Sequence, residues 1–315
     1  MQRIGVHEAV LAALAVALML YAGAVDPTFV SMRAQALLST HVWELAIVAV
    51  PMLLVVISGG IDLSVGATVA LCAVAFGLLV EAGVPVAAAA PLALALGAGA
   101  GALNGALVAR LRVHPLIVTL ATMAAFRGVA EGISLGRPLS GYPDAFIALA
   151  EHRILGVPLP GLVFLAFAGG AALVLSRGTL GRQIYAIGQG ERAARFSGIP
   201  VDRIKTHLYA LSGLACGLAA VLLVARNNTA KADLGMGLEL EAVTCVVLGG
   251  ARIEGGSGNV LGLALGLFLV HETREFVSWH WKQSELNLVV LGGVLLLSVL
   301  ARRMGSRGQE VGDGA

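Results

Sequence analysis

Of the 315 residues of this chain, 58% are hydrophobic and only 13% are charged, about half the charged share of a typical soluble domain. A formal net charge of +2 gives no electrostatic reason to expect nucleic acid as a partner. The composition therefore predicts an all-α, polytopic membrane protein in which residues 1–315 form a single transmembrane domain.

Ten apolar segments follow one another along the chain, and a helix needs about 20 such residues to span a membrane. Several of the segments are shorter than this, which favours broken helices beside glycine-rich stretches. The predicted spans are residues 8–25, 42–58, 66–80, 86–109, 115–133, 160–176, 206–225, 239–251, 258–271 and 286–301.

The first segment allows two interpretations. Arg3, an apolar run and the small residues 22–24 are typical of a secretory signal with a cleavage site. An uncleaved span with a cytoplasmic N-terminus, which we favour, places 12 Lys and Arg residues inside and 7 outside, in the sense of the positive-inside rule. An even number of spans then puts the tail, residues 302–315, in the cytoplasm, and Trp279 and Trp281 in the last outer loop.

Residues 57–66, Ile-Ser-Gly-Gly-Ile-Asp-Leu-Ser-Val-Gly, interrupt the apolar sequence and are called the first break. Backbone that leaves a helix at membrane depth must line a cavity or be buried in protein, and an ionisable group there indicates a functional site. Asp62 either caps free backbone N–H groups or contacts a solute directly. We expect four residues of the break to lie beside a translocation path, namely Gly59, Gly60, Asp62 and Ser64.

The first break has a weak echo later in the chain. Residues 56–60 with Gly66 are similar to residues 247–250 with Gly256. Because transporters often contain internal repeats whose interface holds the substrate, we expect residues 247–256, the second break, to be its counterpart. A chance match in a glycine-rich chain is the alternative. The residues of interest in the second break are Gly249, Gly250, Arg252 and Glu254.

Other polar residues within the spans extend the candidate path, namely Asn104, Thr119 and Arg127. Arg127 and Glu131 are four residues apart, so they can pair on one face of a helix. The pair is either a structural ion pair near the outer interface or part of an external mouth. No span has the series of carboxylates and histidines that a proton relay requires.

Glycines spaced by four residues indicate close packing of helix backbones. One series is Gly97, Gly101 and Gly105, and another is Gly258, Gly262 and Gly266. Packing within the chain is the favoured interpretation, and a subunit interface is the alternative. The cysteines all lie in apolar runs, so we expect packing residues rather than disulfides or metal ligands; they are Cys72, Cys216 and Cys245.

The chain lacks the common catalytic motifs. It contains no Gly-x-x-x-x-Gly-Lys-Ser/Thr, no His-Glu-x-x-His and no Gly-x-Ser-x-Gly. We therefore expect no enzymatic activity, and no metal or cofactor bound by this chain.

Residues 177–205 form the longest polar stretch on the predicted cytoplasmic side. Within it, a short helix is expected from Glu191 to Phe196, stopped by Gly198 and Pro200. A short helix of this kind can dock into a groove on a second protein. A solvated connector is the alternative.

Several motifs, in order along the chain, are similar to those of the permease subunits of bacterial ABC importers for monosaccharides such as ribose, xylose, arabinose and rhamnose. The resemblance covers nearly the whole chain and is sharpest at residues 58–66. Charges at Arg252 and Glu254, and a histidine at His114, depart from the family pattern. The other matching segments are residues 104–105, 114–120, 127–128, 185–188, 191–199, 235–240, 247–250 and 255–258.

This resemblance implies a multi-pass permease of the bacterial inner membrane that forms the path for a monosaccharide. The partners that it implies are a second permease chain (identical or related), ABC ATPase subunits that use ATP, and membrane lipid. It also implies a periplasmic or extracellular sugar-binding protein. The segment that resembles the ATPase contact contains Glu191, Ala194, Arg195, Ser197 and Gly198. Three alternatives stay open: an ABC permease for branched-chain amino acids or nucleosides, an ion-coupled secondary transporter, and a structural membrane subunit.

Overall fold

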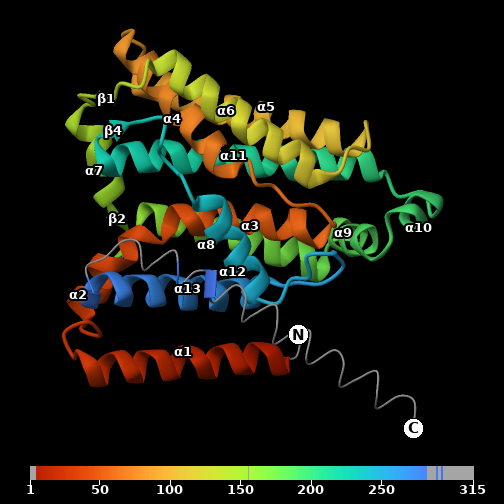
Figure 1. Ribbon diagram of the computed structural model, residues 1–315, viewed down its shortest axis with the longest axis horizontal. Helices are drawn as coiled ribbons and strands as arrows, with labels where there is room; N and C mark the ends of the chain where they lie inside the picture. Colours follow the sequence, from red (N-terminus) through yellow and green to blue (C-terminus); the bar gives the residue numbers. More distant parts are fainter. Residues whose placement is uncertain (1–4, 155, 282–288, 290–291, 294–315) are drawn as a thin grey trace.

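The computed structural model describes residues 5–154, 156–281, 289 and 292–293. Most of the tenth predicted span and the whole of the predicted tail lie outside these residues. The described part of the chain is helical, with four two-residue strands at its edges (Figure 1). The prediction of a helical bundle is therefore confirmed.

The helices begin and end close to the predicted segments in most cases. They are α1 (Val6–Val25), α2 (Met32–Leu38), the 3-10 helix η1 (Ser39–His41), α3 (Trp43–Ile57), α4 (Val65–Glu81), α5 (Val86–Ala109), α6 (Pro115–Ser134), α7 (Asp144–Glu151), α8 (Leu159–Arg177), α9 (Thr179–Gln189), α10 (Glu191–Phe196), α11 (Val201–Asn227), α12 (Leu238–Leu248) and α13 (Val260–Trp281). The strands β1 (Leu139–Ser140) and β4 (Thr229–Ala230) pair antiparallel, as do β2 (Arg153–Ile154) and β3 (Val157–Pro158).

Five of the described helices are long and apolar enough to cross a membrane: α1, α5, α6, α8 and α11. The pair formed by α2 with η1 and α3, bent by 55°, makes a sixth if it is one span. Helix α12 has only 11 residues, so at about 1.5 Å per residue it covers roughly half of a hydrocarbon core about 30 Å thick. The described residues thus form a helical membrane protein with short and bent helices beside the breaks.

Two predicted loops are helical. The structure continues α13 to Trp281, well past residue 271, so Trp279 and Trp281 lie in its last turn rather than in a loop. The apolar run stops at residue 271 because charged residues follow it. Glu272 and Glu275 are buried against the protein, so these charges do not end the helix. Likewise, residues 177–205 consist mainly of α9, α10 and the start of α11, and α10 has the predicted bounds.

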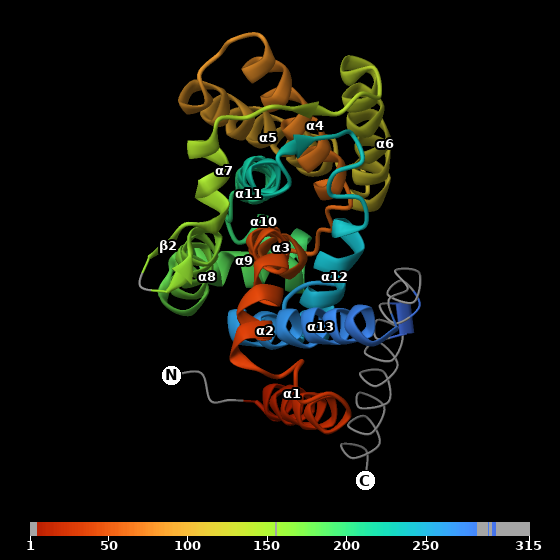
Figure 2. The ribbon, with the colours of Figure 1, turned by 90° about the vertical axis from the view of Figure 1, so that its left-hand side faces the viewer.

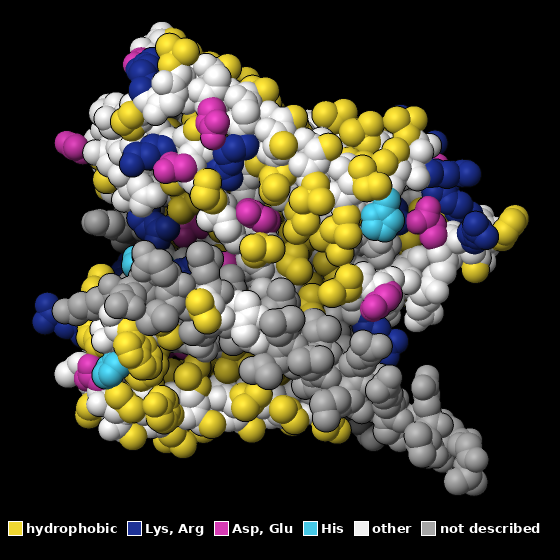
Figure 3. Space-filling model, in the orientation of Figure 1, with side chains coloured by type: hydrophobic (Ala, Val, Ile, Leu, Met, Phe, Trp, Pro, Cys, Tyr) yellow, Lys and Arg dark blue, Asp and Glu magenta, His cyan; other side chains and the backbone are white. Residues whose placement is uncertain are grey.

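The helices lie in successive layers (Figures 1 and 2). Helix α1 packs on α13, which packs on α12 and α3; α11 lies between α3 and the pair α4 and α5; and α6 covers α4. The start of α1 lies at the same end of the bundle as α9 and α10, whereas α2, α7 and the strands lie at the other end (Figure 1). Charged side chains gather mainly at these two ends, with hydrophobic side chains across the middle (Figure 3).

Glycines allow close packing between two pairs of neighbouring segments. A Cβ at Gly105 of α5 would lie 2.7 Å from the Thr206 Cα of α11, and one at Gly217 of α11 would lie 2.8 Å from the Ala93 carbonyl oxygen of α5. On the other side, a Cβ at Gly249 would lie 2.5 Å from the Gly262 carbonyl oxygen of α13. Both glycine series thus serve packing within the chain, because side chains there would force the backbones apart.

Candidate functional site

Asp62 lies at the centre of the first break and is only 2% exposed. Its Oδ1 accepts hydrogen bonds from the Ser64 backbone N–H at 3.1 Å and from the Ser64 hydroxyl at 2.6 Å. Its Oδ2 accepts a hydrogen bond from the Ser212 hydroxyl of α11 at 3.0 Å. The carboxylate therefore fixes the turn that leads into α4 and joins it to α11, as aspartate side chains do when they bond to the backbone two residues further on.

The same cluster includes Asn104 of α5, whose side-chain amide donates to the Ser64 hydroxyl at 2.8 Å. Asn104 is fully buried, and its Oδ1 has no hydrogen-bond partner among the described residues. We call Asp62, Ser64, Asn104 and Ser212 the Asp62 cluster. It connects α4, α5 and α11 by side-chain hydrogen bonds, in a region where water is scarce and each such bond replaces a costly unpaired group.

Two hydroxyls hold the next carbonyl of the break. The Ile61 carbonyl oxygen accepts hydrogen bonds from Tyr209 of α11 at 3.2 Å and from Thr119 of α6 at 3.4 Å. Gly60 makes room for this arrangement, because a Cβ there would lie 2.7 Å from the Tyr209 hydroxyl oxygen. The structure thus brings together Gly60, Asp62, Ser64, Asn104 and Thr119 of the predicted path.

Ser212 and Tyr209 were not predicted as site residues. They lie three residues apart and therefore on one face of α11, in an otherwise apolar run. That pattern is the signal that could have identified them.

The two breaks meet at the end of the bundle that carries α9. The Gly256 backbone N–H donates to the Ile57 carbonyl oxygen at 2.8 Å, and a Cβ at Gly255 would lie 2.8 Å from the Gly59 nitrogen. Gly188 of α9 packs against the same two segments. Gly59 has a φ of 76° and Gly255 a φ of 97°, a region that favours glycine. The close approach thus requires glycine for both space and backbone conformation.

The remaining predicted residues of the second break lie elsewhere. Gly249 and Gly250 follow the end of α12, where Gly249 packs on α13 rather than on the Asp62 cluster. Arg252 and Glu254 are exposed. The second break therefore faces the first through its glycines, and its charged residues point away from the buried cluster.

Arg127 of α6 binds backbone rather than Glu131. Its guanidinium donates to the Ala232 carbonyl oxygen and, at 3.1 Å, to the Leu234 carbonyl oxygen, both in the segment before α12. Glu131 is exposed, and the described residues form no ion pair between the two. The i, i+4 spacing made the pair possible, but the backbone oxygens near α12 satisfy Arg127 instead.

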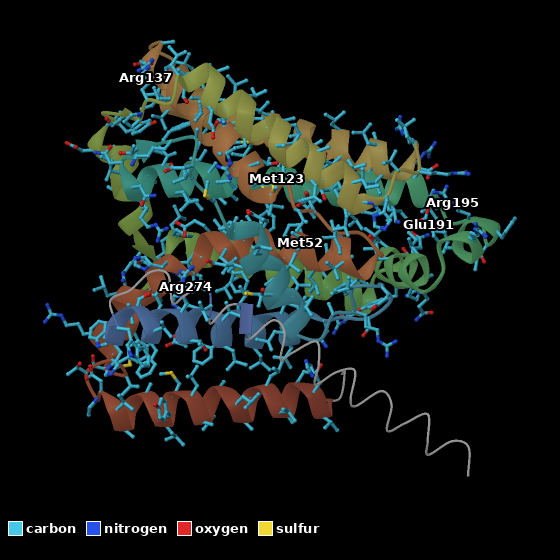
Figure 4. The ribbon with its side chains drawn as sticks, viewed as in Figure 1. Met52, Met123, Arg137, Glu191, Arg195 and Arg274 are labelled. Carbon is cyan, nitrogen blue, oxygen red and sulfur yellow. The ribbon has the colours of Figure 1, made fainter. Side chains whose placement is uncertain are left out.

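The predicted coupling helix α10 is tied to α11 by ion pairs. Glu191 accepts from Arg195 at 2.8 Å and from the buried Lys205 at 2.6 Å, and Arg195 lies 2.5 Å from Asp202. Burial opposes ionisation of Glu191, but the hydrogen bonds from Lys205 and Arg195 outweigh it and hold the pKa of Glu191 below its ordinary value. Glu191 and Arg195 lie together at one end of the molecule (Figure 4).

The predicted coupling residues differ in their exposure. Ala194 is buried, the Ser197 hydroxyl donates to the Ala193 carbonyl oxygen, and Gly198 forms the turn after α10 with a φ of 81°. The side chain that projects from α10 is Phe196, which is 93% exposed and was not among the predicted residues. The network therefore positions the helix, and Phe196 is its most exposed apolar group.

Among the described residues, no group of three or more His, Cys, Asp or Glu side chains could hold a metal ion. The three cysteines are buried and free, as packing residues would be.

Comparison with known proteins gives a consistent assignment. The model of the family described as branched-chain amino acid transport system / permease component matches residues 36–299. The autoinducer 2 import system permease protein LsrD of Photorhabdus laumondii is 35% identical over 99% of this chain and 95% of its own length. LsrD of Escherichia coli K12 is 36% identical over 96% of this chain and 94% of its own length. LsrD of Yersinia enterocolitica is 39% identical over 82% of this chain and 80% of its own length.

No solved structure matches the chain. The relatives are transport components rather than enzymes, in agreement with the missing catalytic motifs. With helices that can cross a membrane, a break held by buried hydrogen bonds and a family match over most of its length, the chain belongs to the permease components of the branched-chain amino acid transport system family.

Proposed function

We propose that this chain is the permease subunit of an ATP-driven ABC importer in a bacterial inner membrane, and that it forms the path for a monosaccharide or a similar small polyhydroxylated solute. The observation that carries the proposal is the similarity over almost the full length to permeases whose names state autoinducer 2 import. The motifs that resemble sugar permeases, above all residues 58–66, point to the same solute class.

The partners follow from what this chain lacks. It has no nucleotide-binding motif, so ATP is bound and hydrolysed by separate ATPase subunits. Helix α10, with Phe196 exposed and its ion pairs turned toward α11, is suited to insert into a groove on such a subunit. A second permease chain, identical or related, completes the path, and a soluble binding protein delivers the solute from outside.

The orientation has both termini in the cytoplasm, with ten spans when short and broken segments are included. The start of α1 and helices α9 and α10 lie at one end of the bundle, which supports a cytoplasmic N-terminus (Figure 1). We call this end the inner end, and the end with α2, α7 and the strands the outer end.

The mechanism needs a connection between α10 and the path. Helix α10 follows directly on α9, and Gly188 of α9 packs against both breaks. A displacement of α10 by the closing ATPases thus reaches residues 57–66, while the Asp62 cluster holds α4, α5 and α11 together as one body. ATP acts as a switch because it binds the two access states with different affinity.

The test is purification of the tagged chain from its native membrane in mild detergent, followed by reconstitution of the co-purifying proteins in liposomes. We expect ATP-dependent uptake of a monosaccharide or of autoinducer 2, with leucine as the comparison because the family description names branched-chain amino acids. Uptake by the chain alone, driven by an ion gradient without ATP, would contradict the proposal.

A further inference from the structure

A polar cavity of about 570 Å³ opens at the outer end of the bundle, away from the Asp62 cluster. Its walls come from η1 and α3, the end of α11, the segment before α12, α12 itself and α13. The charged and polar residues that line it are His41, Glu44, Arg226, Asn227, Glu241 and Arg274. Its volume lies in the range of about 300–1,000 Å³ that is usual for small-molecule sites.

The charges of the cavity are arranged in pairs. Arg226 Nε lies 3.3 Å from Glu44 Oε1, and Arg274 lies 2.7 Å from Glu241 and 3.3 Å from Glu275. Each guanidinium thus lies against at least one carboxylate, and an anionic ligand gains little here. Arg274 lies toward the end opposite Glu191 and Arg195 (Figure 4).

The pairs do not use all of the polar atoms. The side chain of Glu241 is 19% exposed and those of Arg226 and Arg274 are each 26% exposed, so these groups keep accessible surface where they line the cavity. Carboxylate oxygens there need a hydrogen-bond donor and guanidinium N–H groups need an acceptor. A hydroxyl group meets this need without breaking an ion pair, since it can donate to a carboxylate and accept from a guanidinium at once.

Apolar side chains complete the cavity on its other sides. Leu45, Leu223, Met236 and Leu238 line it beside the charged groups. A site with apolar walls and a few convergent polar groups is the usual form of a small-molecule site. The C–H faces of a sugar ring would lie against these walls, with its hydroxyls toward the charged pairs.

We propose that this outer cavity, lined by Glu44, Arg226, Glu241 and Arg274, binds a neutral polyhydroxylated solute. The identification of this solute as the transported cargo rests on the proposed function. The proposal adds a location that neither the motifs nor the family assignment gives, separate from the first break.

The test is protection of an introduced thiol in the complete reconstituted importer. All three native cysteines are buried, so Asn227→Cys and Met236→Cys each place the accessible thiol at the cavity. We expect ribose, xylose, arabinose, rhamnose or autoinducer 2 to slow labelling by a membrane-impermeant maleimide about tenfold or more, and leucine to leave it unchanged. Glu81→Cys, at the outer end but outside the cavity, is the control and should label equally with and without solute.

A second substitution tests the chemistry of the cavity. Glu241→Gln keeps the shape of the side chain but removes its charge, and it should abolish the protection seen with Asn227→Cys. Glu81→Gln, a matched change in the exposed pair with Arg137, should leave the protection intact. Labelling at both cavity positions that no solute slows, in an importer that still performs ATP-driven uptake, overturns the site and leaves the proposed function standing. Protection by a solute in a preparation that performs no ATP-driven uptake would contradict the proposed function and support the cavity as a binding site.

Discussion

Gly60 shows how one missing side chain shapes the first break. The space that a Cβ would occupy is taken by the Tyr209 hydroxyl, which donates to the next carbonyl of the chain, that of Ile61. A larger residue at position 60 would therefore displace the hydrogen bond from Tyr209, and little water is present there to replace it.

Gly60→Ala should lower the free energy of unfolding by about 1–3 kcal/mol, as expected for overpacking in a tight site. The second variant Gly60→Ala with Tyr209→Phe removes the atom that the new Cβ would meet. Thermal unfolding in detergent should therefore show less than additive destabilisation in the double variant. Gly99→Ala is the control, since nothing lies near a Cβ at that position of α5. Strictly additive effects would mean that the two residues do not meet.

Asp62 gives a second prediction at this scale. Asp62→Ala leaves the hydroxyls of Ser64 and Ser212 without their acceptor, which should cost about 1–3 kcal/mol for each group left unpaired. Asp62→Asn keeps an oxygen for Ser64 and should be markedly milder. Thermal stability of the purified variants measures this order, and equal stability of the two would contradict the assigned bonds.

At the scale of the element, α10 is a helix of six residues that could not be stable by itself. It is held by ion pairs from Glu191 to Lys205 and from Arg195 to Asp202, both on α11. The sequence motif therefore combines two tasks. The charged residues set the position of the helix, and the exposed face, with Phe196, is left for a partner.

Phe196→Ala should weaken binding of the ATPase by about 2 kcal/mol, or roughly 30-fold, as for an aromatic anchor at an interface. Because the ring is 93% exposed, the stability of the chain itself should not change. Co-purification of the ATPase and solute-stimulated ATP hydrolysis measure the effect. Met32→Ala, an equally exposed residue of α2, is the control and should behave as the native chain. Unchanged ATPase binding in Phe196→Ala would remove α10 from the interface.

Glu191→Gln should act differently from Phe196→Ala. It weakens the tie from α10 to Lys205 of α11 and the pair with Arg195 within α10, so the helix should lose its fixed position while the rest of the bundle stays folded. We expect ATP hydrolysis to continue with less transport per ATP. Native coupling in this variant would contradict the role of the network.

At the scale of the whole molecule, the two ends of the bundle carry different groups. The inner end carries α9, α10 and the meeting point of the two breaks, and the outer end carries the polar cavity and the strands. Helix α11 runs between them and contributes Lys205, Tyr209, Ser212 and Arg226 to successive sites. A single helix of 27 residues thus connects the groups at the two ends.

This arrangement predicts the sidedness of the protein. In intact cells, an impermeant thiol reagent should label Glu81→Cys from outside, whereas Phe196→Cys should react only in inverted membrane vesicles. The buried native cysteines keep the background low, and the cysteine-containing native chain serves as the control. The opposite pattern would reverse the orientation derived from the positive-inside rule.

The sequence alone determined the features that depend on local chemistry. Hydropathy and charge identified a helical membrane protein, the glycines and the carboxylate of residues 57–66 marked a break, and Gly198 and Pro200 ended α10 at Phe196. The glycine series also predicted the close packing of α5, because the spacing of small residues on one helix face is a local property.

Which distant groups meet could be read only from the packed helices. Ser212 binds Asp62 across 150 positions, Arg127 binds the backbone before α12 instead of Glu131, and the outer cavity combines residues from His41 to Arg274. The charged residues after residue 271 do not end α13, because Glu272 and Glu275 are buried in the bundle and Glu275 pairs with Arg274. The reason is physical: periodicity tells which face of a helix is polar, but the partner of that face is chosen by how the helices pack, and this choice depends on contacts spread over the whole chain.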